Sequence, residues 1–121
     1  MEKKKTLVLG ATTNPGRYAY LAAHRLVAAG HDIVNIGIKN GESAGVEIQR
    51  AGAAFPDINT VTLYIGPQRQ PEYYDYIMET RPKRIIFNPG TENPELEALA
   101  QQQGIETVRA CTLVLLSTGQ Y

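Results

Sequence analysis

The feature that most constrains the fold is a regular alternation of short strand-like runs with helical stretches. Runs typical of buried strands occupy residues 5–9, 32–36, 61–65, 84–87 and 106–108. Between them, apolar residues recur with the period of an amphipathic helix. This alternation predicts an α/β fold in which a single Rossmann-like domain spans residues 1–121. Its sheet is expected to have about five mainly parallel strands, with helices on both faces.

Pairs of a polar residue and proline mark the expected helix starts. Asn14-Pro15 supplies an N-cap amide followed by proline at the first helical position, and Gln70-Pro71 and Asn93-Pro94 repeat the pattern. Gly30 stands where glycine commonly ends a helix, and Pro82 is expected to end the second helix. These residues therefore predict three helices between the strands.

Two segments are less regular. Residues 37–59 are rich in Gly and Ala, with a short strand expected at 46–48 and a weak helical turn at 51–55. The tail at 111–116 is apolar enough to pack against the domain.

Composition narrows the function classes. Lys plus Arg and Asp plus Glu number 12 each, which argues against nucleic-acid and membrane-surface proteins because their affinity rests on excess positive charge. The single cysteine excludes an internal disulfide framework and a four-cysteine metal site. The charged start precedes an apolar run that is too short for a signal peptide. We therefore expect a cytoplasmic protein without a metal ion.

The first strand is followed by the sequence GATTNPGR, residues 10–17, here called the first loop. In an open parallel sheet, ligands bind at the carboxyl ends of the strands, where the next helix also points its amino end. Glycines allow close approach of the backbone, Thr12, Thr13 and Asn14 offer polar side chains, and Arg17 can bind phosphate oxygens with its forked guanidinium. The first loop therefore predicts a diphosphate site, although a capped turn without a ligand is the simpler alternative.

Two familiar nucleotide-binding patterns do not fit the first loop. A P-loop requires a glycine and a lysine where this chain has Pro15 and Gly16. The NAD pattern requires glycines at Thr12 and Pro15, together with a carboxylate after the second strand, where the nearest charged residue is Lys39. A lysine there favours an additional phosphate on the ribose. The residues thus indicate a phosphorylated nucleotide other than NAD, with an ordinary NAD(P)-binding domain as the weaker alternative.

Other loops at the same sheet edge are candidates for the groove. Residues 66–70 follow the third strand, and residues 88–93 repeat the Asn-Pro-Gly triplet of the first loop. Two such turns would bracket a shared groove, although Asn-Pro-Gly also simply makes good turns. A tyrosine is expected to stack on an adenine base, and we expect only one to do so among Tyr18, Tyr20, Tyr73, Tyr74 and Tyr76.

Groups suited to catalysis are few. His24 and His31 are expected at the surface or near a helix end, and neither has a recognisable catalytic partner. Cys111 follows the last strand. A buried cysteine usually only packs, but at this sheet edge it would face the thiol end of a ligand.

Together these motifs carry a family resemblance over nearly the whole chain. They are residues 8–12 with 15–17, Asn35, residues 86–90 with 92–93, and Cys111. The chain resembles the small stand-alone CoA-binding proteins, whose fold matches the CoA-binding domain of the succinyl-CoA synthetase α subunit. One difference is that many relatives have Asp-Arg-Cys where this chain has Arg109-Ala110-Cys111.

The resemblance implies a site for coenzyme A or an acyl-CoA. It assigns the diphosphate to the first loop, the adenosine 3′-phosphate to Lys39, and the adenine and pantetheine path to the loops after the third and fourth strands. The cofactor-binding residues implied are Gly10, Ala11, Thr12, Thr13, Asn14, Arg17, Asn35, Lys39, Ile65, Gly66, Pro67, Asn88, Pro89 and Gly90. The synthetase's phosphohistidine loop has no counterpart here, so its ligase activity is not expected.

The hypothesis is therefore a non-catalytic CoA-binding module. The alternative is an enzyme or redox protein in which Cys111 acts on a CoA thiol or thioester. Association into a homodimer is left open, because no residue identifies the surface that would form it.

Overall fold

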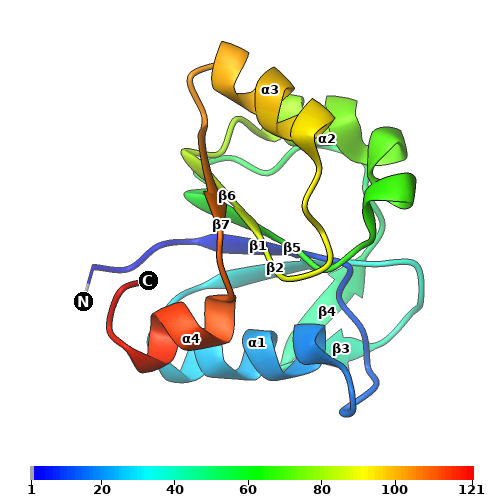
Figure 1. The fold of residues 1–121 in the computed structure, drawn as a ribbon. Coiled ribbons are helices and arrows are strands. Elements are labelled where there is room, and N and C mark those ends of the chain that lie inside the picture. Colours follow the sequence, from blue (N-terminus) through cyan, green and yellow to red (C-terminus); the bar gives the residue numbers. More distant parts are fainter. Residues whose placement is uncertain (1) are drawn as a thin grey trace.

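The computed structural model describes residues 2–121, which form one open mixed sheet with helices on both faces (Figure 1). In this part of the chain the seven strands are β1 (Thr6–Leu9), β2 (Ile33–Ile36), β3 (Glu42–Ser43), β4 (Val46–Gln49), β5 (Thr60–Leu63), β6 (Arg84–Phe87) and β7 (Glu106–Arg109). Their order across the sheet is β3-β4-β2-β1-β5-β6-β7. The predicted Rossmann-like α/β class is confirmed, with more strands than expected.

The centre of the sheet consists of β1 and its two parallel neighbours. Leu7 of β1 lies opposite Val34 of β2 and Val61 of β5. Every residue of these three strands is buried. Helices cover both faces of a parallel sheet, which explains why even the polar side chains of these strands, such as Thr60 and Thr62 of β5, are buried.

The helical elements are α1 (Tyr18–Ala28), the 3₁₀ helix η1 (Pro67–Tyr73), α2 (Tyr74–Thr80), α3 (Pro94–Gln102) and α4 (Thr112–Ser117). Figure 1 shows α1 and α4 on one face of the sheet and α2 and α3 on the other. Each face has its own core. Ala23 and Leu26 of α1 belong to one buried cluster, and Ile77 of α2 and Leu96 of α3 belong to the other.

Two of the predicted helix starts are wrong. Helix α1 begins at Tyr18 rather than after Asn14-Pro15. The Asn14 side chain accepts a hydrogen bond from the amide of Gly16, at 2.9 Å, and so stabilises a local turn instead of capping the helix. In the second case, Pro71 lies inside η1 and α2 begins at Tyr74.

Other expectations about helix ends and tails are confirmed. Gly30 follows the end of α1 with a φ of +91°. The Asn93 side chain accepts hydrogen bonds from the amides of Glu95 and Leu96 and so caps α3. The apolar tail forms α4, which packs against α1.

The segment 37–59 also differs from the sequence-based prediction. The expected short strand becomes β4, which lies parallel to β2, and β3 adds an antiparallel strand at the edge. The turn expected at 51–55 is not helical. His31, expected at the surface or near a helix end, follows the end of α1 but is only 2% exposed, and its Nδ1 accepts a hydrogen bond from the amide of Lys4 at 2.9 Å.

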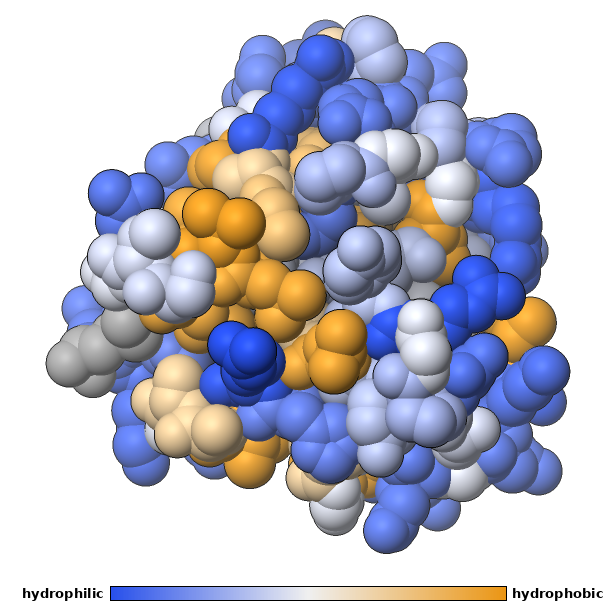
Figure 2. Space-filling view, turned by 60° about the horizontal axis from the view of Figure 1, so that its bottom comes forward, coloured by the Kyte–Doolittle hydropathy of each residue, from blue (hydrophilic) through white to orange (hydrophobic). Residues whose placement is uncertain are grey.

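The face that carries α1 and α4 remains partly apolar at its surface. Figure 2 brings this side forward and shows apolar residues gathered among polar ones. Leu21 of α1 and Val114 of α4 are among the exposed large apolar residues. Within residues 2–121, no helix is both long enough and apolar enough to cross a membrane.

Candidate functional site

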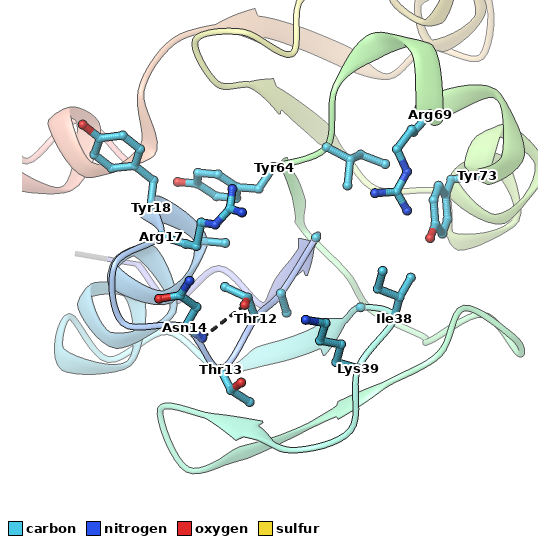
Figure 3. Close-up of a pocket in the computed structure, with 15 residues that line it drawn as sticks. Thr12, Thr13, Asn14, Arg17, Tyr18, Ile38, Lys39, Tyr64, Arg69 and Tyr73 are labelled. Carbon is cyan, nitrogen blue, oxygen red and sulfur yellow. Dashed lines mark hydrogen bonds between the residues drawn. The ribbon is translucent and has the colours of Figure 1, made fainter.

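The loops after the three central strands meet at a reversal in strand order. The chain passes from β1 to β2 on one side and later returns to β5 on the other side of β1. Ligands of open α/β sheets bind at such a point. A cavity of about 500 Å³ lies there (Figure 3), lined by Gly10, Ala11, Thr12, Thr13, Asn14, Arg17, Tyr18, Ala19, Gly37, Ile38, Lys39, Tyr64, Ile65, Arg69 and Tyr73. Its size falls within the usual range for small-molecule sites.

Only glycine can occupy two positions in these loops. Gly10 has a φ of +102°, and a Cβ atom there would lie 2.8 Å from the carbonyl oxygen of Tyr64. A Cβ on Gly37 would overlap the carbonyl oxygen of Ala11. The loops after β1, β2 and β5 therefore pack backbone against backbone at the base of the cavity.

The first loop is shaped by hydrogen bonds within itself. The amide of Asn14 donates to Oγ1 of Thr12 at 3.1 Å, the contact drawn in Figure 3. The amide of Arg17 donates to the carbonyl oxygen of Asn14 at 3.1 Å. The amides of Gly10 and Ala11 both donate to the carbonyl oxygen of Ile36, which fixes the base of the loop to the end of β2. The loop thus has a defined shape before any ligand binds.

The amino end of α1 has no cap of its own. Arg17 occupies the N-cap position in an extended conformation and makes no side-chain capping bond, and the first turn contains no acidic residue. Tyr18 and Ala19, the first two residues of the helix, line the cavity. The partial positive charge at this helix end is therefore directed at the cavity and is suited to an anion.

Three basic side chains add to this positive potential. Arg17, Lys39 and Arg69 line the cavity, and no carboxylate is among the lining residues that the structure describes. In Figure 3 the amino group of Lys39 points towards Thr12, whereas Arg69 extends from η1 on the opposite wall. A cavity with this charge pattern attracts phosphate groups.

Three tyrosines complete the walls. Tyr18, Tyr64 and Tyr73 line the cavity. Burial raises the pKa of Tyr64 to about 12, an effect that the nearby hydroxyls of Thr112 and Thr62 partly oppose. The Tyr64 hydroxyl therefore stays protonated at neutral pH.

A model of the CoA-binding domain family matches residues 4–117. The chain belongs to this family. It is also similar to several solved structures over most of their length. A crystal structure of an uncharacterized protein is 51% identical, with a TM-score of 0.97 and full coverage of both chains. None of the curated proteins matches the chain.

Two more distant structures share the fold of this CoA-binding domain. A hypothetical protein from Pyrococcus horikoshii OT3 is 27% identical, with a TM-score of 0.84, and the match covers 96% of this chain and 82% of that one. A protein from Thermus thermophilus described as cell-free ID.343 is 21% identical, also with a TM-score of 0.84. That match covers 98% of this chain and 91% of the other, and at this identity it shows the fold alone.

The cavity of the CoA-binding domain brings together part of the predicted site. The predicted residues that line it are Gly10, Ala11, Thr12, Thr13, Asn14, Arg17, Lys39 and Ile65. Of the tyrosines considered for stacking, Tyr18 and Tyr73 line it. Tyr74 instead bonds to Glu95 and Asn93.

Six predicted residues lie outside the cavity lining: Asn35, Gly66, Pro67, Asn88, Pro89 and Gly90. The side-chain Nδ2 of Asn35 donates hydrogen bonds to the carbonyl oxygens of Ser43 and Val46, at 3.0 and 3.1 Å. These bonds hold the β3–β4 hairpin to β2. The Asn88 side chain is fully engaged in hydrogen bonds within the protein. Its Nδ2 donates to Thr62 Oγ1 and to the carbonyl oxygen of Leu63, and its Oδ1 accepts from the amide of Thr112.

Sequence reasoning missed other lining residues, among them Gly37, Ile38 and Tyr64, and it included Arg69 only as part of the candidate loop 66–70. Gly37 directly follows β2 and Tyr64 directly follows β5. The available signal was their position immediately after a strand, which by itself places a residue at the ligand edge.

Cys111 is partly buried and immediately precedes α4. It is not one of the cavity-lining residues. Across residues 2–121, no three residues among His, Cys, Asp and Glu cluster in a way that could hold a metal ion.

Proposed function

We propose that this protein binds coenzyme A or an acyl-CoA in the cavity and serves as a non-catalytic binding module. The observation that carries the proposal is the uncapped amino end of α1, which opens into a cavity lined by three basic side chains and no carboxylate. Membership of the CoA-binding domain family selects CoA among the phosphorylated nucleotides that such a cavity would suit.

The lining residues fit the chemistry of CoA. Its diphosphate would lie at the first loop, where the start of α1, Thr12, Thr13 and Arg17 supply donors. Ile38 and Tyr73 offer apolar and aromatic surface for the nucleoside. CoA itself supplies a thiol that carries acyl groups, and the protein's part is to bind and orient it. Contacts from Gly66, Pro67, Pro89 and Gly90 stay predictions.

The composition of the cavity supports a binding role rather than catalysis. The lining residues include no His, Cys, Asp or Glu, the side chains that most often transfer protons or attack substrates. Tyr64 has a pKa of about 12, far from the value suited to a base at neutral pH. The lining side chains therefore have charge and shape for holding a ligand, without an evident acid, base or nucleophile.

Isothermal titration calorimetry with CoA and NAD tests the proposal. CoA is expected to bind, and NAD to bind much more weakly. Arg17→Gln should weaken CoA binding by about ten- to a hundredfold, because it removes charge-assisted hydrogen bonds worth on the order of 1.5–3 kcal/mol.

The matched control is Arg25→Gln, which removes the same charge from an exposed position on α1 outside the cavity lining. This variant should bind CoA like the wild type. Equally weak binding of CoA and NAD by the wild type would refute the proposal.

A further inference from the structure

Arg69 and Tyr73 form a wall of the cavity that the family resemblance did not assign. Both belong to η1 and both line the cavity. Figure 3 shows them across the cavity from the first loop, with Ile38 below. The site therefore has a basic group on η1, across the cavity from Arg17.

The element that carries Arg69 is firmly held. The side chain of Gln70 is completely buried and donates to the carbonyl oxygens of Ile65 and Thr91, at 3.0 and 2.8 Å. Its Oε1 accepts a hydrogen bond from Nδ2 of Asn93 at 2.9 Å. These bonds tie η1 to the end of β5 and to the start of α3. Arg69 therefore projects from a fixed base rather than from a loose loop.

The guanidinium of Arg69 has little competition within the protein. Its ion pair with Glu72 is long, at 3.9 Å, and both side chains are about half exposed. Such a surface pair contributes little. Most of the forked donor set of Arg69 is thus available to an anion in the cavity.

The distribution of charge suggests which anion Arg69 meets. The start of α1 and Arg17 lie on the side of the cavity formed by the first loop, and the amino group of Lys39 points towards Thr12 of that loop, so that these groups suffice for a diphosphate. CoA carries one more anionic group, the phosphate monoester on its ribose, with a charge of about −1.5 to −2 at neutral pH. Arg69 is the third basic residue of the lining and stands on the wall that the nucleoside would reach.

We infer that Arg69 is a specificity-determining residue that recognises the ribose phosphate of CoA, a role that the family resemblance gave to Lys39. This inference rests on the proposed function. It assigns Lys39 to the diphosphate together with Arg17. Discrimination between CoA and 3′-dephospho-CoA should then depend on η1.

The test measures dissociation constants for CoA and 3′-dephospho-CoA at one ionic strength, for the wild type and three variants. Arg69→Gln should lose about tenfold in CoA affinity and less than about twofold for dephospho-CoA. Arg69→Lys should bind CoA more tightly than Arg69→Gln but less tightly than the wild type, because lysine keeps the positive charge without the forked donors of the guanidinium. Lys39→Gln should weaken both ligands by the same factor.

Each contrary result has a distinct meaning. An equal loss for both ligands in Arg69→Gln would overturn the inference, as would a loss specific to CoA in Lys39→Gln. Equal wild-type affinity for the two ligands would also overturn it while leaving the proposed function intact. If the wild type binds neither ligand, the proposed function fails and the inference with it. Thermal unfolding checks that each variant is folded.

Discussion

Two corners of this molecule, the first loop and the loop after β6, contain the same tripeptide but have different roles. Asn14-Pro15-Gly16 lies in the first loop, and Asn88-Pro89-Gly90 follows β6. Asn14 is exposed, lines the cavity and bonds only to its near neighbours. Asn88 is 2% exposed, and its side chain joins the end of β5 to the start of α4. Burial, rather than the tripeptide itself, decides which corner is structural.

The helices that follow these corners, α1 and α3, differ in how the protein caps their amino ends. Helix α3 is capped by Asn93, and its first turn contains Glu95 and Glu97. Both features complement the partial positive charge of the helix end. Helix α1 has no side-chain cap and no acid in its first turn. The amino end of α3 is thus capped by the protein itself, whereas that of α1 lacks a side-chain cap and borders the cavity.

The largest expected effect comes from the buried asparagine. Asn88→Ala should lower the free energy of unfolding by about 3 kcal/mol, because it leaves the buried amide of Thr112 and the carbonyl of Leu63 without partners. Asn14→Ala should change it by less than about 0.5 kcal/mol. Urea unfolding of the two variants measures the difference. A similar loss of unfolding free energy in both variants would show that Asn14 and Asn88 contribute equally to stability.

The next largest difference is expected between the stability costs of replacing Gly10 in the first loop and Gly90 in the loop after β6. Gly10→Ala places a Cβ against the backbone of Tyr64 at a φ of +102°, so we expect a loss of about 2–3 kcal/mol. Gly90→Ala also has a positive φ, of +91°, but its Cβ would meet no atom within 4 Å. Its cost should be about 1 kcal/mol, that of the left-handed backbone alone. Thermal or urea unfolding separates the two, and an equal cost would contradict the packing argument.

The sequence predicted the sheet and the edge at which the cavity lies, because both depend on local patterns. Parallel strands buried on both faces are rich in apolar and β-branched residues, and the residues after them must lie at the carboxyl edge. The first loop could therefore be placed beside the cavity before the structure was known. Asn93-Pro94 also predicted the start of α3 correctly, because its cap is formed by residues close in sequence.

Long-range hydrogen bonding set the limit of prediction. The role of Asn88 depends on Thr62 and Thr112, which lie 26 and 24 residues away. Arg69 lies in the candidate loop 66–70 but was not singled out, because its position depends on the buried bonds of Gln70 to Thr91 and Asn93. No local pattern around Asn88 or Arg69 reveals such partners, and this explains why the structural role of Asn88 was not predicted.

The contrast between the uncapped start of α1 and the capped start of α3 can be tested with a variant that gives α1 a cap. Arg17→Asp would supply an N-cap acceptor and a negative charge, and it should stabilise the protein by about 1 kcal/mol. The same change should weaken CoA binding by more than about tenfold, because an aspartate at this place repels phosphate. Urea unfolding and calorimetry on one preparation measure both effects. A gain in stability without a loss of affinity would show that CoA does not use this helix end.

The smallest effect is expected at Cys111, which precedes α4 near the Asn88 corner and outside the cavity lining. Cys111→Ser should change the affinity for CoA by less than about twofold, because a ligand held at the first loop gains no energy from a residue that does not line its site. Incubation of the wild type with the disulfide of CoA, followed by mass spectrometry, should leave the protein mass unchanged. A mixed disulfide that forms in the wild type and not in Cys111→Ser would show that the thiol end of CoA reaches this cysteine. The second corner would then belong to the binding site, and the role of the protein would extend to thiol chemistry.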